Sequence, residues 1–290
     1  MSATIECPPL ILSVKTGTWR CHDVEAEDKD IEFQVVRDKI LQRDKSTCKG
    51  CGAFTTRVVI EKKPDSNDGG VAPGTRRGSG YFEVHHIDDD HGNNDPSNLI
   101  LLCPYCHGVF HCGNAGHRGM GMIIDAPWIS QADLNILMHA MFSVIARSED
   151  KVYMGEIKPA NKTATVLSAD EAKQVREIAE EVRRRYASLQ NLSAGIEARF
   201  GQGMSDAAKF GRVLLELHRR NPKRYAEREK FLGGARLLPF YDYFNTPIQL
   251  RLIPPVQYWA SRPANNGYAP LQLFERLEQW SSEIKNALGQ

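Results

Sequence analysis

The sequence predicts an α+β protein in which a small zinc-bound unit of two strands and a helix precedes a mainly helical C-terminal domain. Two C-x-x-C pairs, at residues 48–51 and 103–106, predict the metal-bound unit, and short apolar runs beside them predict its strands. Apolar residues at helical spacing after Ser130 and Ser168 predict the helical domain. A chain of 290 residues with 41% hydrophobic and 25% charged residues can bury the cores of one large or two modest domains.

The N-terminal half alternates between short apolar runs and segments rich in glycine, proline and aspartate. In chain order we expect a strand at 5–14, a helix at 31–43, a strand at 56–60, a loop at 62–80, strands at 81–87 and 99–102, a helix from 103 and a glycine-rich loop at 113–121. The loop is expected to be inserted into a hairpin in which Tyr81–Ile87 is the returning strand of Thr56–Ile60.

The C-terminal half carries two capping signatures, Ser130 with Asp133 and Ser168 with Glu171, each followed by an apolar stripe at helical spacing. Shorter helices are expected at 194–200 and 206–219, and a last helix from Phe274 to Leu288. The predicted domains are a zinc-bound domain at 1–147 (core 44–117, flexible loop 62–80), a linker at 148–167, a helical domain at 168–240 and a tail at 241–290 that is rich in proline and aromatic residues.

The two C-x-x-C pairs, Cys48 with Cys51 and Cys103 with Cys106, are separated by 51 residues. Four thiolates around one zinc ion form a closed, tetrahedral, structural site. The alternative is a redox C-x-x-C, which usually opens a helix in a thioredoxin-like unit, and neither pair has that context. We therefore predict structural zinc. The remaining thiols (Cys7, Cys21 and Cys112) are expected to be ordinary.

Between and beside the cysteine pairs stand Glu83-Val84-His85-His86-Ile87, then Asn98, then His107 and His111. This order resembles the ββα-metal motif of HNH nucleases: a strand ending in histidine, an asparagine on the loop, and a helix bearing metal ligands. The His-His pair with a later His-x-x-x-His is most similar to the colicin DNase version. Most HNH proteins have Asp-His where this chain has His85-His86, so the first ligand differs in type.

The residues themselves support a metal site of this kind. His107 and His111 are four apart and share one helix face, and His85 on the strand completes a three-histidine site. Three imidazoles favour zinc, nickel or a similar transition ion, with manganese or magnesium as alternatives. Because consecutive strand residues point to opposite sides, His86 is separated from the metal and available as a general base. Asn98 is expected to hold the loop and orient His86.

Charge counts against a nuclease. The net charge of the chain is +1, and residues 48–117 carry six basic against eight acidic residues, including Asp88-Asp89-Asp90. A DNA-binding surface normally neutralises several phosphates with Lys and Arg. His91 and His117 are interpreted as surface or packing residues, the acidic run as a solvated loop, and Arg183-Arg184-Arg185 as a solvated helix face.

The chain also resembles the IcmJ/DotN family of type IVB secretion and conjugation systems, over roughly residues 5–240. The likeness lies in Trp19-Arg20, Lys39–Asp44, Asn93-Asn94-Asp95, Gln131–Asn135, Phe200-Gly201 and Arg236–Pro239, besides the cysteines and histidines. It implies a protein docked on the coupling ATPase or its adaptors, with the HNH-like fold serving assembly. Three hypotheses stay open: an interaction subunit of this kind, which we prefer, a metal-dependent endonuclease that acts on DNA, and, as a distant third for lack of any recognition-helix signal, a regulator that binds DNA without cutting it. With no transmembrane run or signal peptide, we expect a cytoplasmic location.

Overall fold

A computed structural model describes residues 5–15, 26–54, 58–60, 76–78, 81–159, 166–246 and 255–260. The chain divides into two units, one formed by residues 1–10 and 15–107 and the other by residues 11–14 and 108–290. The predicted α+β class is confirmed, with small two-stranded sheets and a mainly helical C-terminal half. The division falls between residues 107 and 108, and the helix that follows Ser130 packs on elements further along the chain.

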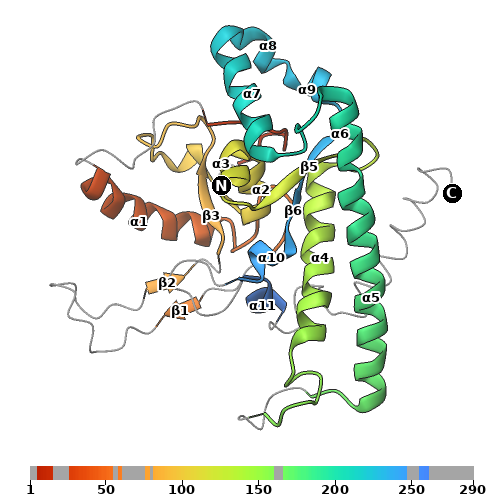
Figure 1. The fold of residues 1–290 in the computed structure, drawn as a ribbon. Helices are drawn as coiled ribbons and strands as arrows, with labels where there is room; N and C mark the ends of the chain where they lie inside the picture. Colours follow the sequence, from red (N-terminus) through yellow and green to blue (C-terminus); the bar gives the residue numbers. More distant parts are fainter. Residues whose placement is uncertain are drawn as a thin grey trace. The chain divides into compact units, whose positions relative to one another are not determined.

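Among the described residues, the first unit contains a long helix, short strands, a 3-10 helix and the beginning of a short helix; Figure 1 labels α1, β1, β2, β3 and α2. Its elements are α1 (Ala26–Arg43), β1 (Val58–Ile60), β2 (Arg76–Gly78), β3 (Glu83–His86), the 3-10 helix η2 (Pro96–Asn98), β4 (Leu99–Leu102) and α2 (Pro104–Phe110), which continues into the second unit. The four residues of β4 are fully buried, and α1 packs against this strand. The core of the unit therefore lies around β4, directly before the second cysteine pair.

The strand pairing differs from the predicted hairpin. β1 pairs with β2, and β2 lies inside the segment 62–80 that was expected to be a loop. β3 pairs with β4 in antiparallel register. His85 lies opposite Ile100, and His86 lies opposite Leu99. The physical reason is burial: the apolar run of β4 needs a partner that covers it, and β3 is buried at Val84, His85 and His86. The remainder of the predicted loop, 61–75 and 79–80, lies outside the described residues.

Helices dominate the second unit. Its elements are α3 (Cys112–His117), β5 (Gly121–Asp125), α4 (Gln131–Glu149), α5 (Ala169–Asn191), α6 (Ser193–Phe200), α7 (Ala207–Arg220), α8 (Pro222–Ala226), α9 (Arg228–Leu232), β6 (Ala235–Pro239), α10 (Tyr241–Phe244) and α11 (Pro255–Ala260). The antiparallel pair β5–β6 was not predicted, because each strand has only five residues and its partner is more than 100 positions away. Residues 113–117, expected to lie in a glycine-rich loop, belong to α3, and the predicted helix at 274–288 lies outside the described residues.

The strand predicted at Ile5–Val14 is wrong, since the described part of this segment forms neither strand nor helix. Its end is nevertheless held in place. The Ser13 amide donates to the Val109 carbonyl, and the Ser13 carbonyl accepts from the Cys112 amide. The segment thus satisfies backbone groups at the junction of α2 and α3, where helix termini leave donors and acceptors unpaired.

The long helix α4 is apolar on nearly every face because α5, β6 and α11 all pack on it. Figure 1 shows α4 and α5 side by side. Tyr186 of α5 donates a hydrogen bond to the Pro239 carbonyl at 2.9 Å and packs edge-on against Phe142 of α4. No helix among the described residues combines the length and apolarity needed to cross a membrane.

The capping box predicted for α5 is present. Ser168 accepts from the Glu171 amide, and the Glu171 carboxylate accepts from the Ser168 amide at 2.9 Å. We expect Ser168→Ala to lower the free energy of unfolding of the second unit by about 1 kcal/mol, because the Glu171 amide loses the Ser168 hydroxyl as its acceptor. Urea unfolding followed by circular dichroism measures this. Ser188→Ala is the control, because Ser188 is exposed within α5 and alanine is a better helix former; an equal loss in both variants would contradict the capping argument.

Candidate metal centre

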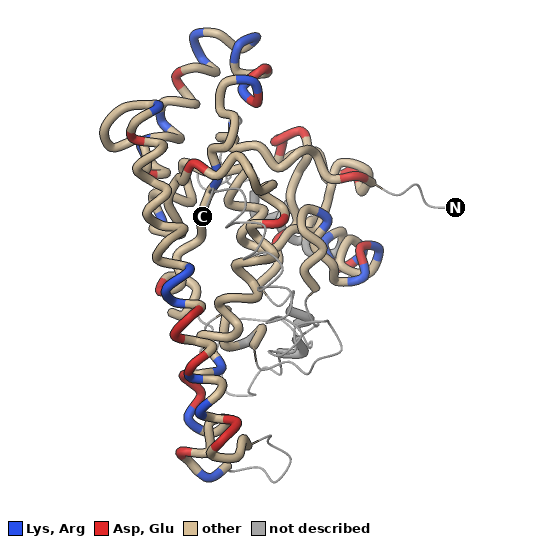
Figure 2. Tube along the Cα trace, turned by 90° about the vertical axis from the view of Figure 1, so that its right-hand side faces the viewer, with Lys and Arg blue, Asp and Glu red and all other residues tan. Residues whose placement is uncertain are grey.

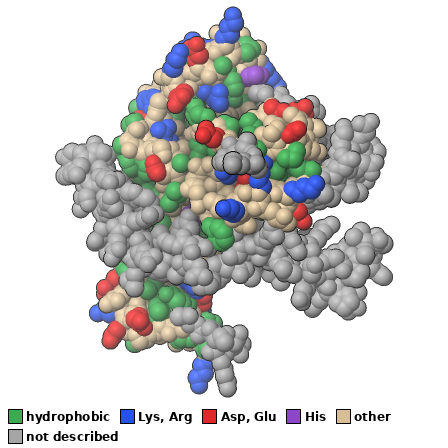
Figure 3. Space-filling model, turned by 180° about the vertical axis from the view of Figure 1, so that it is seen from behind, with side chains coloured by type: hydrophobic (Ala, Val, Ile, Leu, Met, Phe, Trp, Pro, Cys, Tyr) green, Lys and Arg blue, Asp and Glu red, His purple; other side chains and the backbone are tan. Residues whose placement is uncertain are grey.

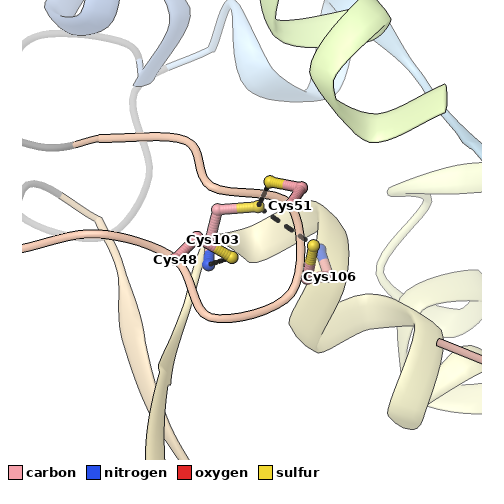
Figure 4. A group of neighbouring side chains, drawn as sticks. All are labelled: Cys48, Cys51, Cys103 and Cys106. Atoms are coloured by element: carbon pink, nitrogen blue, oxygen red, sulfur yellow. Dashed lines mark hydrogen bonds between the residues drawn. The ribbon is translucent and has the colours of Figure 1, made fainter. Parts of the chain in front are cut away.

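Cys48, Cys51, Cys103 and Cys106 come together in the first unit, all buried (Figure 4). Their sulfur atoms lie within 4.8 Å of one another, and the Cys51 and Cys103 sulfurs are 3.7 Å apart. Four thiolates at the usual zinc–sulfur bond length would place neighbouring sulfurs about 3.8 Å apart in a tetrahedron. The donor set and its spacing therefore fit a single tetrahedral metal ion.

The local backbone explains why these cysteines converge. The first pair forms a tight turn in which the Gly52 amide donates to the Cys48 carbonyl, with Gly52 at a positive φ of 77°. A side chain at Gly50 would meet the Cys106 sulfur at 2.9 Å, so only glycine lets the turn approach α2 this closely. Amides directly after β4 and within α2 point at the sulfurs: the Cys103 amide donates to the Cys48 sulfur at 3.2 Å, and the Cys106 amide donates to the Cys103 sulfur at 3.4 Å.

These amides favour thiolates, but burial opposes them. Burial raises the pKa of Cys103 and of Cys106 well above the ordinary thiol value, and contacts with Cys48 and Cys51 raise both pKa values further, although the contact with Cys103 opposes the rise at Cys106. Four negative charges cannot share this volume without a cation, and a metal ion would displace the protons as it binds. Cys112 is also fully buried, and burial raises its pKa to about 12, so it is an inert thiol as predicted. Cys21 lies outside the described residues.

A second donor group consists of His85, His107 and His111, whose ligand nitrogens lie within 4.8 Å of one another. His85 comes from β3, His107 from α2 and His111 from the turn at the end of that helix. Nδ1 of His107 lies 3.0 Å from a Glu83 carboxylate oxygen, which favours a proton on Nδ1 and directs the Nε2 lone pair outward. Burial, reinforced by the charges of nearby histidines, lowers the pKa of His85 to about 3, so this imidazole is neutral at pH 7.

His86 lies outside this group, as the alternation of strand side chains requires. Its Nε2 is 3.0 Å from the Asn94 side-chain oxygen, and its ring stacks on His91 with centroids 5.0 Å apart. Because an amide oxygen only accepts hydrogen bonds, Nε2 carries the proton and the neutral ring has its lone pair on Nδ1. His86 is also only 4% exposed, and this burial holds the ring in one orientation.

Asn98 organises the loop between β3 and β4. Its side-chain nitrogen donates to Asp88 at 2.8 Å and to the Asn93 carbonyl at 3.0 Å, while its side-chain oxygen accepts from the Asp88 amide. The predicted contact with His86 is made instead by Asn94, which the sequence placed only within the family resemblance. Asp88 also accepts from Asn93 at 2.7 Å, so part of the acidic run holds the loop and is not merely solvated.

The end of α1 fixes the same loop from outside. Arg43 pairs with Asp44 at 2.8 Å and donates to the carbonyls of Pro96 and Leu99, both at 2.6 Å. The Asp44 carboxylate in turn accepts from the Leu101 amide of β4 at 2.9 Å. Apart from the family resemblance, no pattern in the sequence selects these two residues. They anchor β4 on the side away from β3, and thereby position the cysteine that follows it.

Comparison with known proteins gives three findings. The sequence model of the family described as HNH endonuclease matches residues 74–111. The chain is 28% identical over 242 residues to the Type 4 apparatus protein DotN of Legionella pneumophila, covering 83% of this chain and 87% of that protein. The chain is DotN-like and carries an HNH-like domain. It is also 34% identical over 84 residues to the "Probable HNH endonuclease" of Lactococcus phage SK1, covering 26% of this chain and 65% of the phage protein.

The extent of these similarities separates two parts of the chain. The HNH match includes both histidine positions of β3, Asn98, the second cysteine pair and both histidines of the α2 end, but it excludes Cys48 and Cys51. The DotN similarity is far longer, and it must include much of the second unit. The DotN-like chain therefore shares with its relative a helical unit that the HNH motif does not require.

Proposed function

We propose that this DotN-like chain is a component of a type IV apparatus, with the four cysteines binding a structural zinc ion and the HNH-like domain serving assembly or substrate delivery. The observation that carries the proposal is the similarity to DotN over 83% of the chain. An isolated nuclease module would resemble its relatives through the HNH segment alone. The proposed partner is the coupling ATPase of the apparatus or an adaptor bound to it, in the cytoplasm.

Co-purification tests this proposal. The affinity-tagged chain, expressed with the coupling ATPase of its own host, is expected to recover the ATPase in a stable complex of defined stoichiometry. Cys103→Ala is expected to reduce recovery, because loss of zinc disorders the first unit. A chain that elutes alone, with no ATPase or adaptor bound, would count against an assembly role.

A second function is favoured by one specific observation, the arrangement of His86 beside the three-histidine group. A divalent ion held by His85, His107 and His111 would stabilise negative charge on a phosphodiester. Nδ1 of His86 would accept a proton from water, the water oxygen would attack phosphorus, and a sugar oxygen would leave. Asn94 would hold the His86 ring during this step.

If the chain is such an endonuclease, His86→Ala is expected to lower the nicking rate roughly 10²- to 10⁴-fold, the usual contribution of a general base. Nicking of supercoiled plasmid with zinc, nickel, manganese or magnesium measures this, and metal content should reach two ions per chain. His117→Ala is the control, because His117 is exposed and lies outside the donor group. A wild-type chain that cuts neither DNA nor RNA with any of these metals excludes the endonuclease.

A further inference from the structure

Basic residues gather on α7, α8 and α9 of the second unit, far along the chain from the histidines. Residues 209–230, which we name the basic surface, contain eight Lys or Arg residues and three Glu residues, a net charge of +5 in a chain whose total is +1. Figure 2 colours several basic positions blue along the backbone at this end of the second unit, which lies at the top of the view, and Figure 3 shows basic side chains there with a few acidic ones among them. The remainder of the chain is therefore net acidic, and the positive charge is concentrated here.

The fold turns this charge outward. The buried face of α7 is formed by small and apolar residues, among them Ala207, Phe210 and Leu214, and it packs on α3. The other side of the helix carries Lys209, Arg212, Arg219 and Arg220, and helical spacing places them away from that face. Glu216 is the one acidic residue of α7, and it is shared between Arg219 at 3.1 Å and Arg220 at 3.4 Å. Because one carboxylate neutralises only one of these two guanidiniums, the surface of α7 keeps a net positive charge.

The turn from α7 into α8 is held rigidly. Asn221 caps α8 by accepting from the Arg224 amide at 3.0 Å, and buried Tyr225 donates through its hydroxyl to the Val14 carbonyl while accepting from the Val14 amide. The Arg228 guanidinium donates to the Leu12 carbonyl at 3.0 Å. The backbone that bears Arg219, Arg220 and Lys223 is thus fixed, so that a ligand that binds these side chains does not also have to order the backbone.

Helix stability alone does not explain this composition. Cations near the last turn of α7 favour the helix dipole, which accounts for Arg219 and Arg220. Lys209 stands in the first turn, where a positive charge opposes the dipole, and Lys223 stands in the first turn of α8. The dipoles of these helices give no reason for a positive charge at either lysine.

The chemistry of the surface indicates its ligand. Val213 is the one large hydrophobic residue of this surface among those that the structure describes as exposed, so a protein partner would find one apolar side chain there and no cluster of apolar and aromatic anchors. The apolar face of α7 is buried against α3 and cannot enter a lipid bilayer. Binding to a phosphate backbone needs only Lys and Arg at suitable spacing, and guanidiniums suit phosphate oxygens through paired hydrogen bonds.

We propose that the basic surface on α7, α8 and α9 binds the phosphate backbone of a nucleic acid without sequence preference. This inference goes beyond a role in the type IV apparatus and does not require cleavage by the histidines. It assigns nucleic-acid binding to the second unit, whereas the HNH-like core around the cysteines is net acidic.

Fluorescence anisotropy of the full chain with labelled 30-nucleotide single-stranded and duplex DNA tests the proposal. The test variant is Arg219→Ala with Arg220→Ala and Lys223→Ala. The matched control is Lys173→Ala with Arg176→Ala and Arg184→Ala on α5, which removes the same charge from residues that are also exposed and that pair with carboxylates of the described chain. Circular dichroism and gel filtration verify that both triple variants remain folded.

We expect the wild-type chain to bind at 50 mM salt, with affinity falling as salt rises. The basic-surface variant should bind roughly tenfold or more weakly, and its salt slope on duplex should fall by about 0.9 for each phosphate that the variant no longer neutralises. The α5 control should retain the wild-type affinity. No binding by the wild type, or an equal loss in both triple variants, overturns the proposal. Vesicles with 30% phosphatidylserine form a further arm: binding there through the same three residues, without DNA binding, would assign the surface to membranes and overturn it as well.

Discussion

Replacement of Cys103 by alanine is expected to release the zinc ion and to unfold the first unit. A structural zinc site contributes about 10–16 kcal/mol of folding free energy, which matches or exceeds the total stability of about 5–15 kcal/mol of an ordinary domain. The first unit has little else to replace it. Its buried sheet has two strands of four residues, and an isolated pair of this size is marginal in water.

The position of Cys103 makes this variant the most damaging of the four. It follows β4 directly, its amide donates to the Cys48 sulfur, and its own sulfur accepts from the Cys106 amide. Atomic absorption should show zinc falling from one structural ion per chain to none, and hydrogen exchange should show loss of protection at the β4 amides. Chelation of the wild type should produce the same exchange pattern.

Cys112→Ala is the matched control, because Cys112 is equally buried but belongs to the second unit and to no donor group. It removes one sulfur atom from a packed site, which should cost about 1 kcal/mol and leave zinc content unchanged. A Cys103→Ala chain that still binds one zinc ion tightly, with β4 amides protected, would falsify the four-cysteine site.

The sequence predicted the parts of the fold whose cause is local. Two C-x-x-C pairs that share one metal ion must lie close together, whatever path the chain takes between them. Ser168 and Glu171 specify the start of a helix without help from distant residues. What the sequence did not predict depends on distant partners. β5 pairs with β6, although α4 to α9 lie between them in the sequence. β3 pairs with β4 and not with the strand predicted before the loop.

The candidate site divides in the same way. Residue type and spacing were sufficient to select His85, His107 and His111, which the structure brings together, although His111 lies in the turn after α2 and not on the helix face expected for it. Asn94 and the Arg43–Asp44 pair act through loop geometry that no periodicity encodes. In the sequence, these three residues stand out only because they lie in segments that resemble the IcmJ/DotN family. Such a resemblance does not say which groups a residue contacts.

The contact between α3 and α7 leads to the other large expected effect. Gly211 of α7 faces Gly113 of α3 so closely that a methyl group at Gly211 would lie 2.3 Å from the Gly113 Cα atom and 2.6 Å from its backbone nitrogen. Neither atom belongs to a side chain that could rotate away, so the helices must separate. We expect Gly211→Ala to lower the free energy of unfolding of the second unit by about 3 kcal/mol, although alanine is the better helix former.

Gly113→Ala is the control because it places the same methyl group in the same helix contact from the other side. Its nearest neighbour would be the Gly211 Cα atom at 3.6 Å, an ordinary van der Waals distance, so the change should cost less than about 1 kcal/mol or stabilise α3 slightly. Urea unfolding followed by circular dichroism compares the two variants. A similar loss of stability in both variants would mean that any added volume at this contact is harmful. A large loss in Gly211→Ala alone would show that the helices are close only where the Gly211 Cα atom would point a methyl group at the backbone of α3. Since α7 bears the basic surface on its outer side, Gly211→Ala should also weaken nucleic-acid binding at temperatures where the second unit begins to unfold.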